Sequence, residues 1–138
     1  MKGTGMNDDT DQEERHINWT LGTDPIEVDA ERGYFKGWYQ GRPELSNGRN
    51  IVQGGILGAM LDNAMAYAAM ARLGEGRHIM SLEMKTTFMA PAPLERLIGE
   101  GWVVKMGRSI AFLEARISDQ QGTVLATASS TARIANAG

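Results

Sequence analysis

The stretch GGILGAMLDNAMAYAAMARL runs from Gly54 to Leu73 and is apolar at most of its positions. Its apolar side chains recur at spacings of three and four residues, which is the period of an α-helix, at Ile56, Met60, Ala64, Tyr67 and Ala71. Most other positions are also apolar or alanine, so we expect one helix that is buried around most of its circumference. The segment Gly74-Glu75-Gly76 is expected to end it.

The sequence on both sides of this helix has the pattern of β-strands. Between Met80 and Phe88, apolar and polar residues alternate with period two, and Pro91 and Pro93 follow. Turn-forming residues separate six such segments, which we expect at about residues 26–31, 34–39, 80–88, 96–106, 109–118 and 123–133. One long helix against about six antiparallel strands predicts an α+β domain in which the sheet wraps around the helix.

The length and organisation of the chain predict one folded domain. Its 138 residues are the usual size of a single domain, and no repeat or linker divides them. Residues 1–24 are expected to form a flexible N-terminus, with a short polar helix that begins at Asp9 or Thr10 and continues through Trp19. Residues 25–138 are expected to form the domain itself.

Composition excludes several classes of function. A net charge of -3 and a pI near 5.4 give no basic field for a nucleic acid. The absence of cysteine excludes disulfides, thiolate metal sites and a cysteine nucleophile, and two histidines are too few for a histidine-rich metal site. The N-terminus lacks the apolar core of a signal peptide, and the longest apolar run, 56–61, is too short to span a bilayer. We therefore expect a cytoplasmic protein without nucleic-acid or membrane partners.

Two features of the predicted helix suggest a site. Gly54 and Gly55 at its start let the backbone approach a ligand closely, and free N–H groups there favour a developing negative charge. The same glycines would also permit a tight turn into the helix without any function. Asp62 is a carboxylate in an apolar helix, so it is expected to be paired, hydrated or functional. A functional Asp62 is a nucleophile or a general base; otherwise it faces solvent or pairs with an arginine at a subunit contact.

The spacing of these features predicts an oligomer. Gly55 and Asp62 are seven residues apart, which is about 10 Å along a helix. A single reacting carbon does not reach both ends of that span. A site that uses both ends therefore needs two helices, one from each subunit, running antiparallel across a two-fold axis.

Several motifs resemble one known family. The motifs are NGRNIVQGG at 47–55, Leu61-Asp62, MKTTFMAP at 84–91, Gly107-Arg108-Ser109 and ISDQQGTVLATA at 117–128. Together they resemble the thioesterases of the phenylacetate-degradation type, over about residues 25–133. The resemblance implies the hot-dog fold and hydrolysis of acyl-CoA. Gln53 stands where that family usually has a histidine before its two glycines.

The resemblance also implies how the central residues act. Hot-dog thioesterases pair side by side and build two sites per dimer, so Gln53 and Gly54 of one chain are expected to face Asp62 of the other. The Gln53 side chain and the Gly54 backbone N–H would then polarise the thioester carbonyl. Asp62 would deliver water to the carbonyl carbon or attack it directly.

Further residues are candidates on weaker grounds. Ser81 matches a serine that some animal members place beside the catalytic Asp, where it could orient the attacking water. From the alternation of the strand alone, Ser81 is an exposed serine on the face opposite Leu82 and Met84. His78 just precedes Ser81 and could approach the site, although a single histidine is more often structural.

The loops supply candidates for substrate binding, together with Gly55 at the helix start. Asn47 matches a loop asparagine that helps to hold the substrate carbonyl, and its alternative role is that of a turn residue before Gly48. Arg108 and Ser109 lie at a turn between strands, where a guanidinium and a hydroxyl could grip the phosphates of CoA. A solvated turn is the alternative there.

We therefore expect an acyl-CoA thioesterase that releases free acid and CoA from an aromatic or medium-chain substrate. No metal or redox cofactor is needed, and the expected assembly is a homodimer that pairs into a dimer of dimers. The first alternative is a non-catalytic hot-dog dimer that binds acyl-CoA, which Gln53 in place of histidine makes credible. The second is a hot-dog hydratase or dehydratase, whose chemistry usually employs a helix histidine that is absent here. The sequence leaves open the acyl group, the role of Asp62 and the arrangement of a tetramer.

Overall fold

In the computed structural model, which describes residues 16–136, the chain begins with the short helix α2 (Ile17–Leu21). Nδ1 of His16 caps this helix by accepting from Asn18 N–H at 3.2 Å, and Gly22, with a φ of 64°, ends it. Most of the short helix expected from Asp9 or Thr10 lies outside the described residues. The described part ends two residues beyond Trp19.

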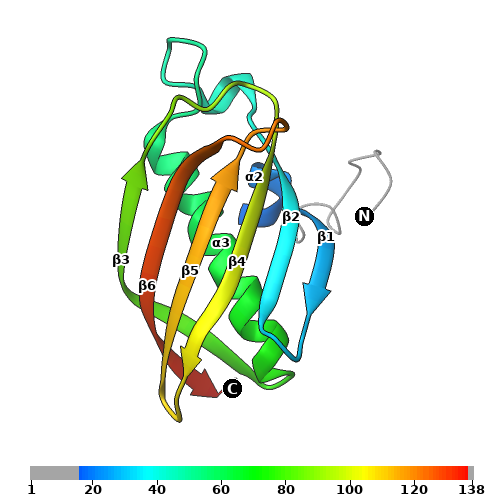
Figure 1. The fold of residues 1–138 in the computed structure, drawn as a ribbon, viewed down its shortest axis with the longest axis vertical. Coiled ribbons are helices and arrows are strands. Elements are labelled where there is room, and N and C mark those ends of the chain that lie inside the picture. Colours follow the sequence, from blue (N-terminus) through cyan, green and yellow to red (C-terminus); the bar gives the residue numbers. More distant parts are fainter. Residues whose placement is uncertain (1–15, 137–138) are drawn as a thin grey trace.

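Six strands form one antiparallel sheet in the order β1-β2-β4-β5-β6-β3 (Figure 1). The strands are β1 (Asp24–Asp29), β2 (Tyr34–Gln40), β3 (Arg77–Phe88), β4 (Arg96–Met106), β5 (Ile110–Ser118) and β6 (Val124–Asn136). The edges of the sheet are β1 and β3, because β3 pairs only with the last strand, β6. This confirms the expected fold class, a long helix against about six antiparallel strands.

The long helix α3 (Gly54–Leu73) lies along one face of the sheet, behind the strands in Figure 1. Its bounds agree with those expected from the sequence. Gln53 is its N-cap and Gly74 its C-cap. Only Gly55 and Arg72 of the helix are exposed, so the expected burial around most of the circumference is confirmed. The buried side of α3 forms the core with Phe35 and Tyr39 of β2, Leu97 of β4, and Leu113 and Ile117 of β5.

Two glycines of β4 bring the helix and the sheet unusually close. A Cβ at Gly101 would lie 2.3 Å from the carbonyl oxygen of Ala64, so the helix backbone rests on the strand backbone there. A Cβ at Gly99 would lie 2.4 Å from the ring of Tyr39. These positions require glycine for space, and they fix where α3 sits along β4.

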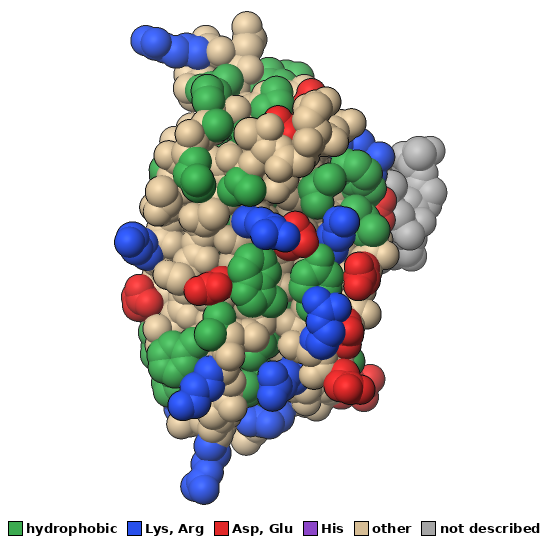
Figure 2. Space-filling model, viewed as in Figure 1, with side chains coloured by type: hydrophobic (Ala, Val, Ile, Leu, Met, Phe, Trp, Pro, Cys, Tyr) green, Lys and Arg blue, Asp and Glu red, His purple; other side chains and the backbone are tan. Residues whose placement is uncertain are grey.

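The outer face of the sheet, which looks away from α3, alternates in charge across the strands. Lys36, Glu100 and Arg116 stand directly opposite one another on β2, β4 and β5. Figure 2 shows hydrophobic side chains on this face interleaved with Lys, Arg, Asp and Glu side chains. Opposite charges at facing positions stabilise neighbouring strands and keep the face hydrated. Within residues 16–136, no helix has the length and apolar character needed to cross a membrane.

Candidate active site

A hydrogen bond joins Asp62 of α3 to Ser81 of the edge strand. Ser81 Oγ on β3 donates a hydrogen bond to Asp62 Oδ1 at 2.8 Å. Asp62 is half-buried and Ser81 is exposed, so the pair lies at the surface, between the middle of α3 and the edge strand. The second carboxylate oxygen accepts from no described residue, which leaves it available to a water molecule or a substrate.

The side of the strand expected for Ser81 is wrong, and a β-bulge explains the difference. The pairing of β3 with β6 shifts between Ser81 and Glu83, so Leu82 is the extra residue. Before the bulge Ser81 pairs with Ala132, and after it Met84 pairs with Ser130, two residues earlier on β6. Ser81 and Met84 therefore face α3 together, although strict alternation puts them on opposite faces.

The N-terminus of α3 carries Gln53, Gly54 and Gly55. Gln53 Oε1 accepts from Gly55 N–H at 2.6 Å and caps the helix, so Gln53 Nε2 remains free to donate. No described residue accepts from Gly54 N–H. Because these groups lie at the positive end of the helix dipole, they suit an anionic oxygen. In one chain this end is separated from Asp62 by two turns of helix, as expected.

Apolar side chains of β3 lie between these two ends. A Cβ at Gly54 would lie 3.4 Å from the ring of Phe88, and one at Gly58 would lie 3.8 Å from Met84 Cε. Gly54, Gly58 and Asp62 share one face of α3 because they are four residues apart. The side chains of Leu82 and Phe88 are more than half exposed, at 58% and 55%. Gly58, Met84 and Phe88 are not among the site residues predicted from the sequence, although a glycine inside a helix is a usable signal.

The loop that precedes α3 holds Asn47. After the single-turn helix η1 (Pro43–Leu45), Asn47 Oδ1 accepts from Arg49 N–H at 2.8 Å, and Asn47 N–H donates to the carbonyl of Ile51. These bonds give Asn47 the turn-forming role that was its alternative. Its side-chain NH₂ group is exposed and bonds no described residue.

Arg108 and Ser109 lie at the other end of the sheet, in the turn between β4 and β5. The carbonyl of Arg108 accepts from Arg77 at 3.5 Å, and that of Ser109 accepts from Ile134 N–H at 2.8 Å. One chain therefore does not bring them together with Gln53. His78, three residues before Ser81, lies on the opposite face of β3 by strand alternation and does not point toward Asp62 of its own chain.

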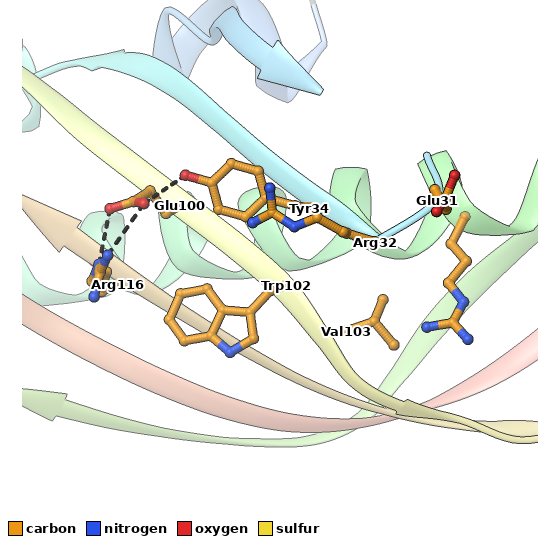
Figure 3. Close-up of a pocket in the computed structure, with 8 residues that line it drawn as sticks. Glu31, Arg32, Tyr34, Glu100, Trp102, Val103 and Arg116 are labelled. Carbon is orange, nitrogen blue, oxygen red and sulfur yellow. Dashed lines mark hydrogen bonds and ion pairs between the residues drawn. The ribbon is translucent and has the colours of Figure 1, made fainter. Parts of the chain in front are cut away.

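A groove of about 470 Å³ lies apart from these residues, mostly on the outer face of the sheet (Figure 3). It is lined by Glu31, Arg32, Tyr34, Arg72, Glu100, Trp102, Val103 and Arg116. In Figure 3, Tyr34 and Arg116 both point to Glu100; Tyr34 Oη donates to it at 2.6 Å and Arg116 Nε at 2.8 Å. The sheet separates this groove from Asp62, so we assign it no catalytic role.

Glu100, which lines the groove, is bonded within the chain to Arg116 and Tyr34. The hydrogen bond from Arg116 lowers the pKa of Glu100 against the opposing effect of burial, and the Tyr34 hydroxyl lowers it further. Burial raises the pKa of Tyr34, and its bond to the carboxylate raises it further. Glu100 is therefore ionised and Tyr34 protonated at neutral pH. Elsewhere too, within residues 16–136, no three His, Cys, Asp or Glu side chains gather closely enough to hold a metal ion.

Comparison with known proteins places this arrangement in a family. Residues 50–126 match the family model of the Thioesterase superfamily. Among solved structures, a phenylacetic acid degradation-related protein from Ralstonia eutropha JMP134 is 32% identical, with a TM-score of 0.80 over 85% of this chain and 88% of that one. No curated protein matches the sequence.

Two more distant structures share the fold. The PaaI protein of the E. coli phenylacetic acid degradation operon is 22% identical, with a TM-score of 0.79 over 91% of this chain and 90% of that one. A Streptococcus mutans UA159 protein, solved bound to acetyl-CoA, is 16% identical, with a TM-score of 0.75 over 83% of this chain and 90% of that one. The family model spans more than half of the chain, and the Ralstonia protein is similar over most of its length. The chain therefore belongs to the thioesterase superfamily, is similar to a phenylacetic acid degradation-related protein, and has the hot-dog fold.

Proposed function

We propose that the protein is an acyl-CoA thioesterase that hydrolyses an aromatic or medium-chain acyl-CoA to the free acid and CoA. The observation that carries the proposal is the hydrogen-bonded pair Asp62–Ser81, beside the apolar side chains of β3. The acetyl-CoA bound to the Streptococcus protein supports a CoA thioester, and the phenylacetic acid context of the Ralstonia and E. coli proteins supports an aromatic acyl group.

In the proposed mechanism, Gly54 N–H and Gln53 Nε2 donate to the thioester carbonyl and stabilise the oxyanion. Asp62 takes a proton from water as the water oxygen adds to the carbonyl carbon. The tetrahedral intermediate then collapses, the C–S bond breaks, and the CoA thiolate receives the proton from Asp62. Direct attack by Asp62, with hydrolysis of the resulting anhydride, leads to the same products. In either case Ser81 holds one carboxylate oxygen and leaves the other to react.

The proposed assembly combines the two halves of the site from two chains. The outer edge of β3 is unpaired in the described chain and exposes Met80, Leu82 and Phe88. Edges of this kind readily pair with another strand. Two β3 edges that meet antiparallel across a two-fold axis would also place the two α3 helices antiparallel. Gln53 and Gly54 of one subunit would then approach Asp62 of the other, and such dimers would pair into tetramers.

Substrate binding is proposed to use both ends of β3. Met84 and Phe88, which face Gly58 and Gly54, would line the acyl group, and Asn47 and Gly55 would border the thioester. The phosphates of CoA would lie near Arg108 and Ser109. The Arg77 guanidinium donates to the backbone carbonyl of Arg108, so a second arginine has its guanidinium beside this turn. Guanidiniums are well suited to phosphate.

A panel of acyl-CoA substrates, with thiol release as the readout, tests the proposal. Phenylacetyl-CoA, other aromatic thioesters and straight chains of increasing length would be compared for the wild type, Asp62→Asn and Ser81→Ala. We expect Asp62→Asn to lower kcat by roughly 10²-fold or more. Asp24→Asn, an exposed carboxylate on the far edge strand, is the matched control and should leave kcat unchanged. Binding of acyl-CoA without release of thiol by the wild type would favour the non-catalytic alternative.

A further inference from the structure

A polar network anchors the side of α3 that faces away from Ser81. Asn63, which follows Asp62, accepts at Oδ1 from Tyr39 Oη at 2.8 Å and from Thr23 Oγ1 at 3.2 Å. Its Nδ2 donates to Asn18 Oδ1 at 2.7 Å, and Asn18 Nδ2 donates to Tyr67 Oη. Asn63 is thereby bonded to β2, to α2 and to the segment between α2 and β1. Asn63 is not among the functional residues predicted from the sequence.

Apolar packing alone does not determine how α3 is rotated about its axis. The buried stripe of the helix is apolar, but its less buried side is apolar as well, at Ile56, Ala59, Ala66, Met70 and Ala71. A rotation by part of a turn would replace some apolar side chains against the sheet with other apolar side chains. The contact of Ala64 with Gly101 fixes the position of the helix on β4, but a single backbone contact does not fix its rotation.

Asn63 supplies the missing constraint. If α3 rotated, Asn63 would lose three hydrogen bonds, and polar groups that are shielded from water and left without a partner destabilise the fold. The bond between Asp62 and Ser81 is single and lies at the surface, so it constrains the helix less. The Tyr39 ring is fully buried and packed against Gly99, so its hydroxyl is a rigid reference point for Asn63.

Consecutive helix residues point about 100° apart. Asn63 reaches toward β2 and α2, while Asp62 reaches toward β3 at the opposite edge of the sheet. We propose that Asn63 is a positioning residue: its bonds to Tyr39, Thr23 and Asn18 set the rotation of α3 and so hold the Asp62 carboxylate at Ser81 and the reacting carbon. The inference rests on the proposed hydrolase function for its kinetic consequence, but not for its geometry.

Two matched tyrosine variants test the proposal. Tyr39→Phe removes a hydroxyl that bonds Asn63, whereas Tyr67→Phe removes one that bonds Asn18 in the same network, one helical turn further on. Combining Tyr39→Phe with Thr23→Val removes both donors to Asn63 Oδ1. We expect this double variant to lower kcat roughly tenfold with KM within about twofold, because a small misplacement of a reacting group is costly. Tyr67→Phe should leave kcat within about twofold, and thermal unfolding would show whether the variants are comparably stable.

A double-mutant cycle separates positioning from a general loss of structure. If Asn63 acts through Asp62 and Ser81, Asn63→Ala should lower kcat much less in a Ser81→Ala background than in the wild type. Additive losses would overturn the proposal, as would kcat losses in Tyr67→Phe equal to those in Tyr39→Phe.

A crystal structure of Asn63→Ala gives a readout that does not depend on activity. We expect the separation of Ser81 Oγ and Asp62 Oδ1 to lengthen beyond about 3.5 Å, the limit of a hydrogen bond. An unchanged contact would overturn the positioning role. A wild type that hydrolyses no thioester would overturn the proposed function instead, and the crystal structure would still decide whether Asn63 sets the rotation of α3.

Discussion

The side-chain amide of Gln53 has two polar groups, an oxygen that accepts hydrogen bonds and an NH₂ group that donates them. Its carbonyl oxygen accepts from Gly55 N–H and caps α3, while in the proposed mechanism its NH₂ group donates to the thioester carbonyl. The usual histidine of the family can occupy the same place as a donor, but it titrates near neutral pH and an amide does not. Substitution at Gln53 can therefore separate helix capping from the proposed catalytic role.

Gln53→Glu is expected to keep the fold and lose the activity. A glutamate still accepts from Gly55 N–H, and its charge favours the helix N-terminus, so the melting temperature should be retained. It no longer donates to the carbonyl oxygen, and it places a negative charge where the oxyanion develops. We expect kcat to fall by about 10²-fold, the typical cost of losing one oxyanion donor. The measurements are thiol release and thermal unfolding of the same preparations.

Gln53→His is the companion variant. It should retain activity and add an ionisation in the neutral range to the pH–rate profile, because imidazole titrates there. Full activity in Gln53→Glu would show that the side chain serves only as a helix cap.

At the scale of elements, Gly58 of α3 and Gly101 of β4 differ in whether a side chain would fit at the position. A Cβ at Gly58 would meet only Met84 Cε, at an ordinary contact distance of 3.8 Å, whereas a Cβ at Gly101 would collide with the backbone of Ala64. Gly58→Ala should therefore stabilise the protein by up to about 1 kcal/mol, the helix propensity difference. Gly101→Ala should destabilise it by about 1–3 kcal/mol, as for an overpacked core. Urea unfolding measures both, and a destabilised Gly58→Ala would contradict the open space beside Met84.

The sequence predicts elements better than it predicts contacts between them. The bounds of α3 follow from the period of its apolar residues and from its flanking glycines. The strands along the chain follow from the alternation of apolar and polar residues. β3 begins at Arg77, three residues before the expected Met80, because Arg77 and His78 lack the apolar alternation but still pair with β6. Asp62 is recognisable as a carboxylate in an apolar helix. The side of the strand that Ser81 occupies depends on the bulge at Leu82, and the bonds of Asn63 depend on the tertiary fold, so neither is visible in local patterns.

At the scale of the whole molecule, the proposed sharing of each site between two subunits predicts complementation. Gln53→Glu and Asp62→Asn, each inactive as a homodimer, would be mixed and allowed to exchange subunits. A hybrid dimer contains one site with both substitutions and one site with neither. An equal mixture should therefore recover about one quarter of the wild-type activity, because about half of the dimers are hybrids and each has one intact site. Hybrids that form, as shown by mass spectrometry, but remain inactive would place the whole site within one chain.

The free energy of unfolding of the whole molecule should fall at both extremes of pH. Glu100 is expected to contribute to the loss of stability at acidic pH. Its pKa is lowered in the folded protein, chiefly by the hydrogen bond from Arg116, so the unfolded chain binds more protons in the acid range. This contribution is complete above the ordinary pKa of glutamate and is lost as pH falls through the lower, folded value. Tyr34 and Tyr39 act in the opposite direction, because burial raises the pKa of both. Their contribution is lost as pH rises above about 10, the ordinary pKa of tyrosine.

The variant Glu100→Gln isolates the contribution of the Glu100 carboxylate to the loss of stability at acidic pH. A glutamine can still accept from the Tyr34 hydroxyl, but it cannot be protonated in this range and forms no ion pair with Arg116. The free energy of unfolding, measured by urea titration across pH, should be lower for Glu100→Gln than for the wild type at neutral pH. The gap should close as pH falls below about 4, where the wild-type carboxylate takes up its proton. The alkaline limb should be present in both proteins, since both keep the two tyrosines. A gap that stays constant from neutral to acidic pH would mean that the substitution acts through packing on the outer face of the sheet and not through the charge of Glu100.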